Sequence, residues 1–172
     1  MFEKLKRRSI QKHTEKNLAG RDRSQVNAAL KTLAFLVDEG LHTNFEPFFD
    51  LASEMGLQRK DVSVFSFLEV TKKTPSLRSN QVNNKHFSWN GAIRNQDAAE
   101  FLDRDFDVLV ALYDQNHTFL NHMVSRSKAK FKVGSQGNDD RLFDLTIAVS
   151  PKNVATFKIE LIKYLKILNK IV

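Results

Sequence analysis

The sequence predicts an α/β domain with a mostly parallel sheet, and two observations support this. Short, nearly continuous apolar runs such as residues 31–40 and 107–114 are typical of strands buried on both faces. Segments with apolar residues at helical spacing lie between these runs, and strand–helix alternation favours parallel pairing. The 172 residues suit one such domain. We therefore expect a Rossmann-like fold with three layers.

The elements can be placed in order along the chain. Residues 2–18 have a thin apolar stripe and are predicted to form a weakly amphipathic helix. We expect residues 1–24 to be a basic helical N-terminal appendage and residues 25–172 to form the single α/β domain. Strands are predicted over 31–40, 61–70, 86–93, 107–114, 127–135 and 141–150, and helices over 44–57, 95–106, 116–128 and 150–172.

Cap residues support two of the helices. Pro47 falls in the first turn of its helix, where proline is tolerated, and Gly56 suits a left-handed C-cap. Ser150 is the predicted N-cap of the last helix, with Pro151 at its first position. The polar stretch over 71–85 is predicted to be a long loop.

The strand over 127–135 alternates apolar and basic residues. Its apolar residues are expected to face the core and its basic ones the solvent. Gly134 near its end is expected in a turn, because no helix follows to supply an anion-binding N-terminus. In the strand over 141–150, four apolar residues are expected to share one face. In the strand over 127–135, the residues expected to face the core are Ala129, Phe131 and Val133, and those expected to face solvent are Lys128, Lys130 and Lys132. In the strand over 141–150, the residues expected to share a face are Phe143, Leu145, Ile147 and Val149.

Composition excludes several function classes. The chain has no cysteine, which excludes disulfides, thiolate zinc sites, iron–sulfur ligation and a cysteine nucleophile. The phosphate-binding P-loop, the G-x-G-x-x-G fingerprint and the G-x-S-x-G elbow are missing from the sequence. No cofactor is predicted. No apolar run is long enough for a membrane span, so we expect a cytoplasmic location.

The net charge of +7 is concentrated near the N-terminus. Residues 1–31 carry nine Lys and Arg against three acids, and the rest is close to neutral. Such a helix could bind RNA or DNA phosphates or an anionic membrane surface, although it lacks aromatic residues after Phe2 to contact bases. The alternative is a solubilising or self-docking helix. The anion-binding candidates are Lys6, Arg7, Arg8, Lys12, Arg126 and Lys128.

A second set of candidates follows the predicted strands. Ligands of open α/β sheets usually bind beyond the carboxyl ends of the strands. Aspartate–histidine pairs there could perform acid–base chemistry or ligate a metal, but no diagnostic spacing supports a metal and none is predicted. His117 could instead cap the helix that starts near Thr118. The ligand-binding candidates are Asp38, His42, Asp114, His117 and Gly134.

The stretch from "FLDRDFDVLVALYDQNHTFLNHMVSRSKAKFKVGS" to "FKIELIKYLKILNKI" resembles a family of short uncharacterised bacterial proteins, a domain of unknown function. The resemblance covers nearly the whole chain and implies no activity. "FDVLVALYD" and "FLNHMVSRSKAKFKVGS" also resemble, more weakly, the first domain of the heptosyltransferase-like glycosyltransferases. That family has a glycine-rich turn after its first strand, whereas here the turn is "VDEGLHT", with a single glycine.

The sequence thus favours a non-catalytic binding or scaffolding domain. Its partner would engage the basic N-terminal segment and the "SRSKAKFK" region. That partner could be anionic, such as RNA or a membrane surface, or it could be a protein. The alternative is a small-ligand or nucleotide-sugar site at the strand ends, which would make the chain a degenerate glycosyltransferase-like enzyme.

Overall fold

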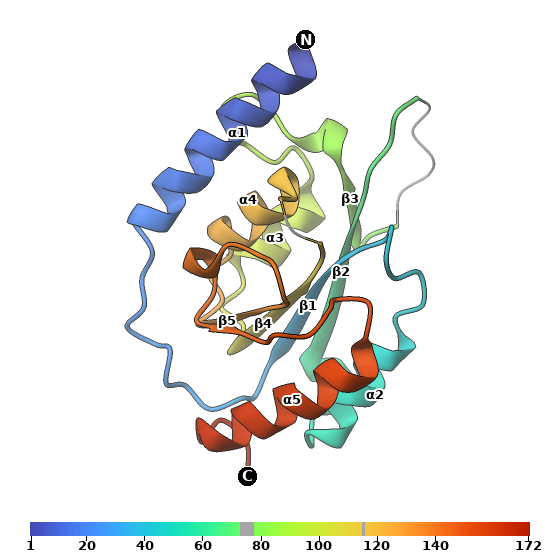
Figure 1. Cartoon of the computed structure of the whole chain (residues 1–172), viewed down its shortest axis with the longest axis vertical. Helices are drawn as coiled ribbons and strands as arrows, with labels where there is room; N and C mark the ends of the chain where they lie inside the picture. The colour runs from blue at the N-terminus through green and yellow to red at the C-terminus, as the bar shows by residue number, and fades with distance from the viewer. Residues whose placement is uncertain (73–77, 115) are drawn as a thin grey trace.

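The computed structural model describes residues 1–72, 78–114 and 116–172 and has the expected Rossmann-like α/β fold (Figure 1). Six strands in these ranges form one parallel sheet in the order β3-β2-β1-β4-β5-β6. Dinucleotide-binding Rossmann sheets share this order, which reverses direction between β1 and β4. The strands are β1 (Leu33–Asp38), β2 (Val62–Leu68), β3 (Gln81–Asn83), β4 (Val108–Leu112), β5 (Phe131–Gly134) and β6 (Leu145–Thr146).

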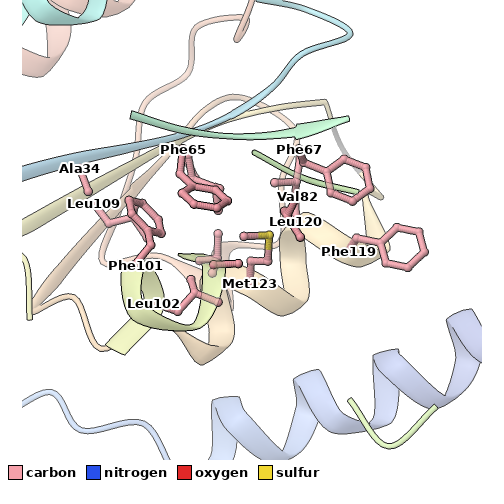
Figure 2. Packing of buried hydrophobic residues seen from close by; sticks show 14 of the residues in the cluster. Ala34, Phe65, Phe67, Val82, Phe101, Leu102, Leu109, Phe119, Leu120 and Met123 are labelled. Atoms are coloured by element: carbon pink, nitrogen blue, oxygen red, sulfur yellow. The ribbon is translucent and has the colours of Figure 1, made fainter. Parts of the chain in front are cut away.

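Helices cover both faces of the sheet (Figure 1). Two helices, α2 and α5, pack on one face, and α3 and α4 pack on the other. Helix α1 lies outside this arrangement, beyond α3 and α4 as seen from the sheet (Figure 2). The helices are α1 (Phe2–Ala19), α2 (Glu46–Glu54), α3 (Gln96–Asp103), α4 (Thr118–Arg126) and α5 (Val154–Ile167), with short 3-10 turns at Arg59–Asp61, Asn84–His86 and Asp140–Leu142.

The central strands bury alternate residues on opposite faces. In β1, Ala34 and Leu36 belong to the core cluster on the α3 and α4 side, and Phe35 belongs to the cluster beneath α2 and α5. Figure 2 shows Phe65 and Phe67 of β2 facing α3 and α4. This double burial explains the nearly continuous apolar runs, because both faces of a strand in this sheet are covered.

Helix α1 is docked along α4. Ile10 is fully buried and joins the core cluster on that side. Asn17 donates a hydrogen bond from Nδ2 to Oγ of Ser125 at 3.1 Å. The predicted helix is therefore present, and it makes side-chain contacts with the α/β body. The domain boundary after residue 24 stays a prediction.

Two strand predictions differ from the structure. The polar stretch over 71–85, expected to be a loop, contains β3 and a 3-10 turn, although residues 73–77 lie outside the described part. Strand β3 is a three-residue edge strand whose single apolar residue is Val82, too short to give a periodic pattern. The segment over 86–93 is not a strand: it forms a turn closed by one antiparallel bridge between Phe87 and Ile93.

The C-terminal predictions also need correction. The strand expected over 141–150 is only β6. Of the four apolar residues, Leu145, Ile147 and Val149 pack with the cluster beneath α2 and α5, as predicted, but Phe143 joins the opposite cluster. Helix α5 begins at Val154, where Oδ1 of Asn153 accepts a hydrogen bond from the Thr156 nitrogen. Ser150 is not this cap, because its hydroxyl accepts from the Lys152 nitrogen in the preceding turn instead.

Candidate functional site

The first candidate region is the edge of the sheet where β1 and β4 end. Asp38 is the last residue of β1, and His117 precedes α4. Nε2 of His117 lies 3.8 Å from Oδ2 of Asp38, so the structure brings these two candidates together at the point where the strand order reverses. Nδ1 of His117 accepts a hydrogen bond from the Leu120 nitrogen at 3.2 Å, which confirms the capping role.

The surroundings of His117 keep its imidazole neutral. Its ring meets Phe67 edge-on, with the centroids 4.8 Å apart. Burial lowers the pKa of His117, although the nearby carboxylates of Asp38 and Glu69 act in the opposite direction. A neutral ring is also what the helix cap requires, because Nδ1 must carry a free lone pair to accept from a backbone N–H.

The remaining strand-end candidates do not join this pair. His42 lies within hydrogen-bond distance of the Pro151 carbonyl, with Nε2 2.7 Å away, which ties the loop after β1 to the segment before α5. Asp114 is exposed and has no hydrogen bond or ion pair with a described residue. Gly134 is not in a turn: it lies within β5, and an added Cβ would fall 2.6 Å from the ring of Phe143.

Other charged groups near this edge are paired with one another. Arg7 of α1 forms an ion pair with Glu69 at 2.7 Å and also lies over the ring of Phe119. Glu39 pairs with Arg78 and accepts a hydrogen bond from the side-chain amide of Gln81. A ligand at this edge would have to compete with these contacts.

The second region is a cleft of about 600 Å³ between the end of α1 and residues 125–130. Arg126 and Lys128, both predicted anion-binding residues, line it and share one carboxylate, that of Asp103, at 3.3 and 3.9 Å. Nη1 of Arg126 is buried with no hydrogen-bond partner among the described residues. Two cations per carboxylate leave a local excess of positive charge.

A buried ionic cluster lies close to this cleft. Lys132, expected to face solvent, is 1% exposed, and its Nζ donates to the Val124 carbonyl at 2.5 Å. Burial, with the nearby Arg21, lowers the pKa of Lys132 to about 7. Arg21 makes a two-pronged ion pair with Asp144, at 2.9 and 2.5 Å. The prediction failed because the alternating pattern cannot distinguish a solvated face from one covered by α4.

The third region is the outward face of α1. Four cations recur there at intervals of four residues, all exposed and none ion-paired with a described residue; they are Lys4, Arg8, Lys12 and Lys16. We call this set the cationic ridge. Of the predicted anion-binding residues of α1, Arg8 and Lys12 belong to it, whereas Lys6 instead donates a hydrogen bond to the Asn84 carbonyl at 3.2 Å.

A tryptophan lies beside the ridge. Trp89 is 46% exposed and lines a cleft of about 810 Å³ together with Leu5, Arg8 and Lys12. The turn that carries it is fixed to α1, because the hydroxyl of Ser9 donates to the Trp89 carbonyl. Trp89 was not among the predicted site residues, because the turn and α1 lie 80 residues apart in the sequence. The signal that the sequence offered was a lone tryptophan in a polar turn.

The glycine in this turn explains the close contact. Gly91 has a positive φ of 79°, which L side chains rarely adopt. An added Cβ would lie 2.8 Å from the side chain of His13, so only glycine lets the turn approach α1 this closely. On the other side, Nε2 of His122 lies 2.7 Å from the Gly91 carbonyl. The turn is thereby held between α1 and α4.

Two other kinds of site are absent from the described residues. No group of three or more His, Cys, Asp or Glu side chains within these ranges is arranged to hold a metal ion. Nor does any helix in them have the length and apolar character needed to cross a membrane.

Comparison with known proteins places the chain in a family. No curated protein and no solved structure matches it. The sequence model of one protein family, described as Family of unknown function (DUF6913), matches residues 6–168, which is nearly the whole chain. The chain therefore belongs to this family of unknown function.

Proposed function

We propose that this chain is a non-catalytic binding module that holds an extended anionic partner along the cationic ridge. The observation that carries the proposal is that Lys4, Arg8, Lys12 and Lys16 are exposed and form no ion pair with any residue in the described ranges. A cation that already has a carboxylate partner must give up that pair to bind another anion. An unpaired, exposed cation releases only its condensed counterions when it meets the charges of a polyanion.

The spacing of the ridge suits a partner with repeated charges. Four helical residues rise about 6 Å, so the ridge runs about 18 Å along α1. At its end, Lys16 lines the same cleft as Arg126 and Lys128. Lys16 thus brings the basic N-terminal segment beside the "SRSKAKFK" region, whose Arg126 and Lys128 share the single carboxylate of Asp103. A cytoplasmic location is part of this proposal, because a chain without cysteine fits a reducing compartment.

The test compares two variants with the same net charge. The ridge variant replaces Lys4, Arg8, Lys12 and Lys16 with glutamine. The control variant replaces four other exposed lysines with glutamine, all outside the ridge: Lys31, Lys60, Lys152 and Lys166. We expect the ridge variant to elute from a heparin column at much lower salt than the wild type, and the control to elute close to it. Equal elution of the two variants would contradict the proposal, because binding would then follow net charge alone.

A second candidate function is a small-ligand site at the strand ends. It is favoured by the 3.8 Å approach of Asp38 and His117 at the point where the strand order reverses, the usual ligand position in open α/β sheets. A thermal-shift screen with nucleotides and nucleotide sugars tests it. A shift that disappears in Asp38→Asn would support it, and no shift with any of these ligands would contradict it.

A further inference from the structure

We propose that the anionic partner is a single-stranded polynucleotide, with a base stacked on Trp89 and its phosphates along the cationic ridge. This inference rests on the proposed function and names the partner class for the same surface. Proteins that bind single strands without reading their sequence combine a basic track for the backbone with aromatic side chains for the bases. Both parts are present on α1 and the turn beside it.

The cleft beside Trp89 has the chemistry that a base and its phosphate need. Trp89 supplies an exposed aromatic surface, and Arg8 and Lys12 supply positive charge. Asn121 also lines the cleft, and its Oδ1 accepts from the Tyr113 hydroxyl at 2.6 Å. Its Nδ2 has no hydrogen bond to a described residue and so remains available to donate to the edge of a base.

Two acidic residues in the same cleft are partly offset by one shared arginine, and the cations of the cleft that form no ion pair with a described residue outweigh the negative charge that remains. Glu15 and Asp139 both line it, and both are bound by Arg141, at 2.8 and 2.7 Å. Arg141 is thus shared between two carboxylates and partly neutralises each of them. The two cations without ion pairs in the cleft, Arg8 and Lys12, remain to attract phosphate.

The extent of the ridge distinguishes a polynucleotide from a free nucleotide. Arg8 and Lys12 line the cleft of Trp89, whereas Lys4 and Lys16 do not; Lys4 lies one helical turn before Arg8, and Lys16 one turn after Lys12. A mononucleotide in the cleft could engage only the middle pair. A strand that passes through the cleft reaches all four cations and continues toward Arg126 and Lys128.

The surface fits a lipid bilayer less well. Helices that lie on membranes bury a continuous apolar face. The exposed large apolar side chains of this region, Met1, Phe2 and Leu5, are confined to the beginning of α1 and the residue before it. Beyond Leu5, the strongly exposed ridge face is polar, and Trp89 lines a hollow instead of a flat surface.

The experiment uses the lone tryptophan of the chain as its reporter. Oligo(dT) and oligo(rU) of about 15 nucleotides, a length within the range of known single-strand sites, are titrated into the full chain at low salt. We expect Trp89 fluorescence to be quenched as the strand binds. The logarithm of the binding constant should fall with the logarithm of salt concentration with a slope of about −2.8, if four phosphates are neutralised. The two oligonucleotides show whether the ribose hydroxyl contributes.

Variants separate stacking from charge. With a fluorescently labelled oligonucleotide and anisotropy as the readout, Trp89→Ala should weaken binding about ten-fold, whereas Trp89→Phe should retain most of the affinity. The ridge variant should lose binding almost completely, and the control variant with equal charge should not. Equal affinities for wild type and Trp89→Ala would overturn the stacking role and with it this inference.

The outcomes also separate this inference from the proposed function. Ridge-dependent heparin binding without quenching by either oligonucleotide would overturn the polynucleotide inference and leave the proposed function standing. Ridge-dependent binding to phosphatidylglycerol vesicles, with no oligonucleotide binding, would overturn it in favour of a lipid surface. If the ridge variant bound both heparin and the oligonucleotides as tightly as the wild type, the two proposals would be overturned together.

Discussion

Two sets of basic residues in this protein have opposite surroundings. Arg21 and Lys132 are enclosed beside Asp144, where the side chains of the Arg21–Asp144 pair are 6% and 9% exposed. The four cations of the ridge are exposed and have no carboxylate partner in the described chain. Arg21 and the ridge belong to neighbouring parts of the same basic segment. Charge counts alone therefore do not distinguish structural cations from cations available for binding, but their pairing does.

Removing the anion of the enclosed set should have the largest effect on stability. Asp144→Asn leaves Arg21 without its carboxylate beside a second buried cation, and we expect unfolding to become easier by about 3 kcal/mol. Urea denaturation measures this. The folded fraction should elute from heparin like the wild type. A loss below about 1 kcal/mol would show that the cluster is less enclosed than the contacts indicate.

Gly91→Ala should have the next largest effect, because it separates the aromatic from the charges. The added methyl group must adopt a positive φ and collide with His13, which should cost about 1–3 kcal/mol and push the turn of Trp89 away from α1. Thermal unfolding and oligonucleotide affinity should both fall. Ser88→Ala, in the same turn, is the matched control. Unchanged affinity in a destabilised Gly91→Ala protein would mean that the position of Trp89 does not matter.

Acid should destabilise the protein through His122, whose Nδ1 lies 3.2 Å from the hydroxyl oxygen of Thr14 where α4 meets α1. Burial lowers the pKa of His122 below its ordinary value of 6.5 in the folded chain. As the pH falls below 6.5, the unfolded chain binds a proton that the folded chain resists, so stability is lost, by at most about 1.4 kcal/mol per pH unit for each such histidine. Denaturation at pH 7 and 5.5 measures the slope, which should be shallower in His122→Gln. An equal slope in that variant would assign the effect to other groups.

The ridge substitutions should have the smallest effect on stability. Exposed residues without partners usually change the free energy of unfolding by less than about 0.5 kcal/mol each, and glutamine has a helix propensity close to that of lysine. The ridge variant should therefore unfold close to the wild type while losing its affinity for polyanions. A large drop in thermal stability would mean that these cations support the fold, and the contrast between the two sets would fail.

The sequence predicted the fold better than the site. Apolar runs and helical spacing identify β1, β4 and the buried face of α5, because burial on two faces leaves a strong pattern. Short edge elements such as β3 leave almost none. Topology predicted five strand-end candidates, because parallel strands bring their carboxyl ends to one edge, and of these only Asp38 and His117 lie together among the described residues.

The details of the basic surface could not be predicted in this way. The sequence shows that Arg7 and Arg8 are adjacent, but only the fold shows that Arg7 meets Glu69 and that Arg8 meets no carboxylate of the described chain. Lys132 has the alternating pattern of an exposed residue and is nevertheless buried by α4. Trp89 joins α1 through a contact that spans 80 residues. In each of these cases, contacts between residues far apart in the sequence determine whether a side chain is paired, buried or exposed. Local sequence patterns carry no information about such contacts.

The parallel docking of α1 on α4 also has a consequence for biosynthesis. Asn17 contacts Ser125, which follows it by 108 residues. A ribosome adding 5–20 residues per second needs about 5–20 s to make that length. Helix α1 therefore leaves the ribosome well before α4, on which it docks, has been synthesised. During that interval Ile10 has no apolar partner from α4. The thin apolar stripe and dense positive charge of this helix disfavour aggregation of the nascent segment during that interval.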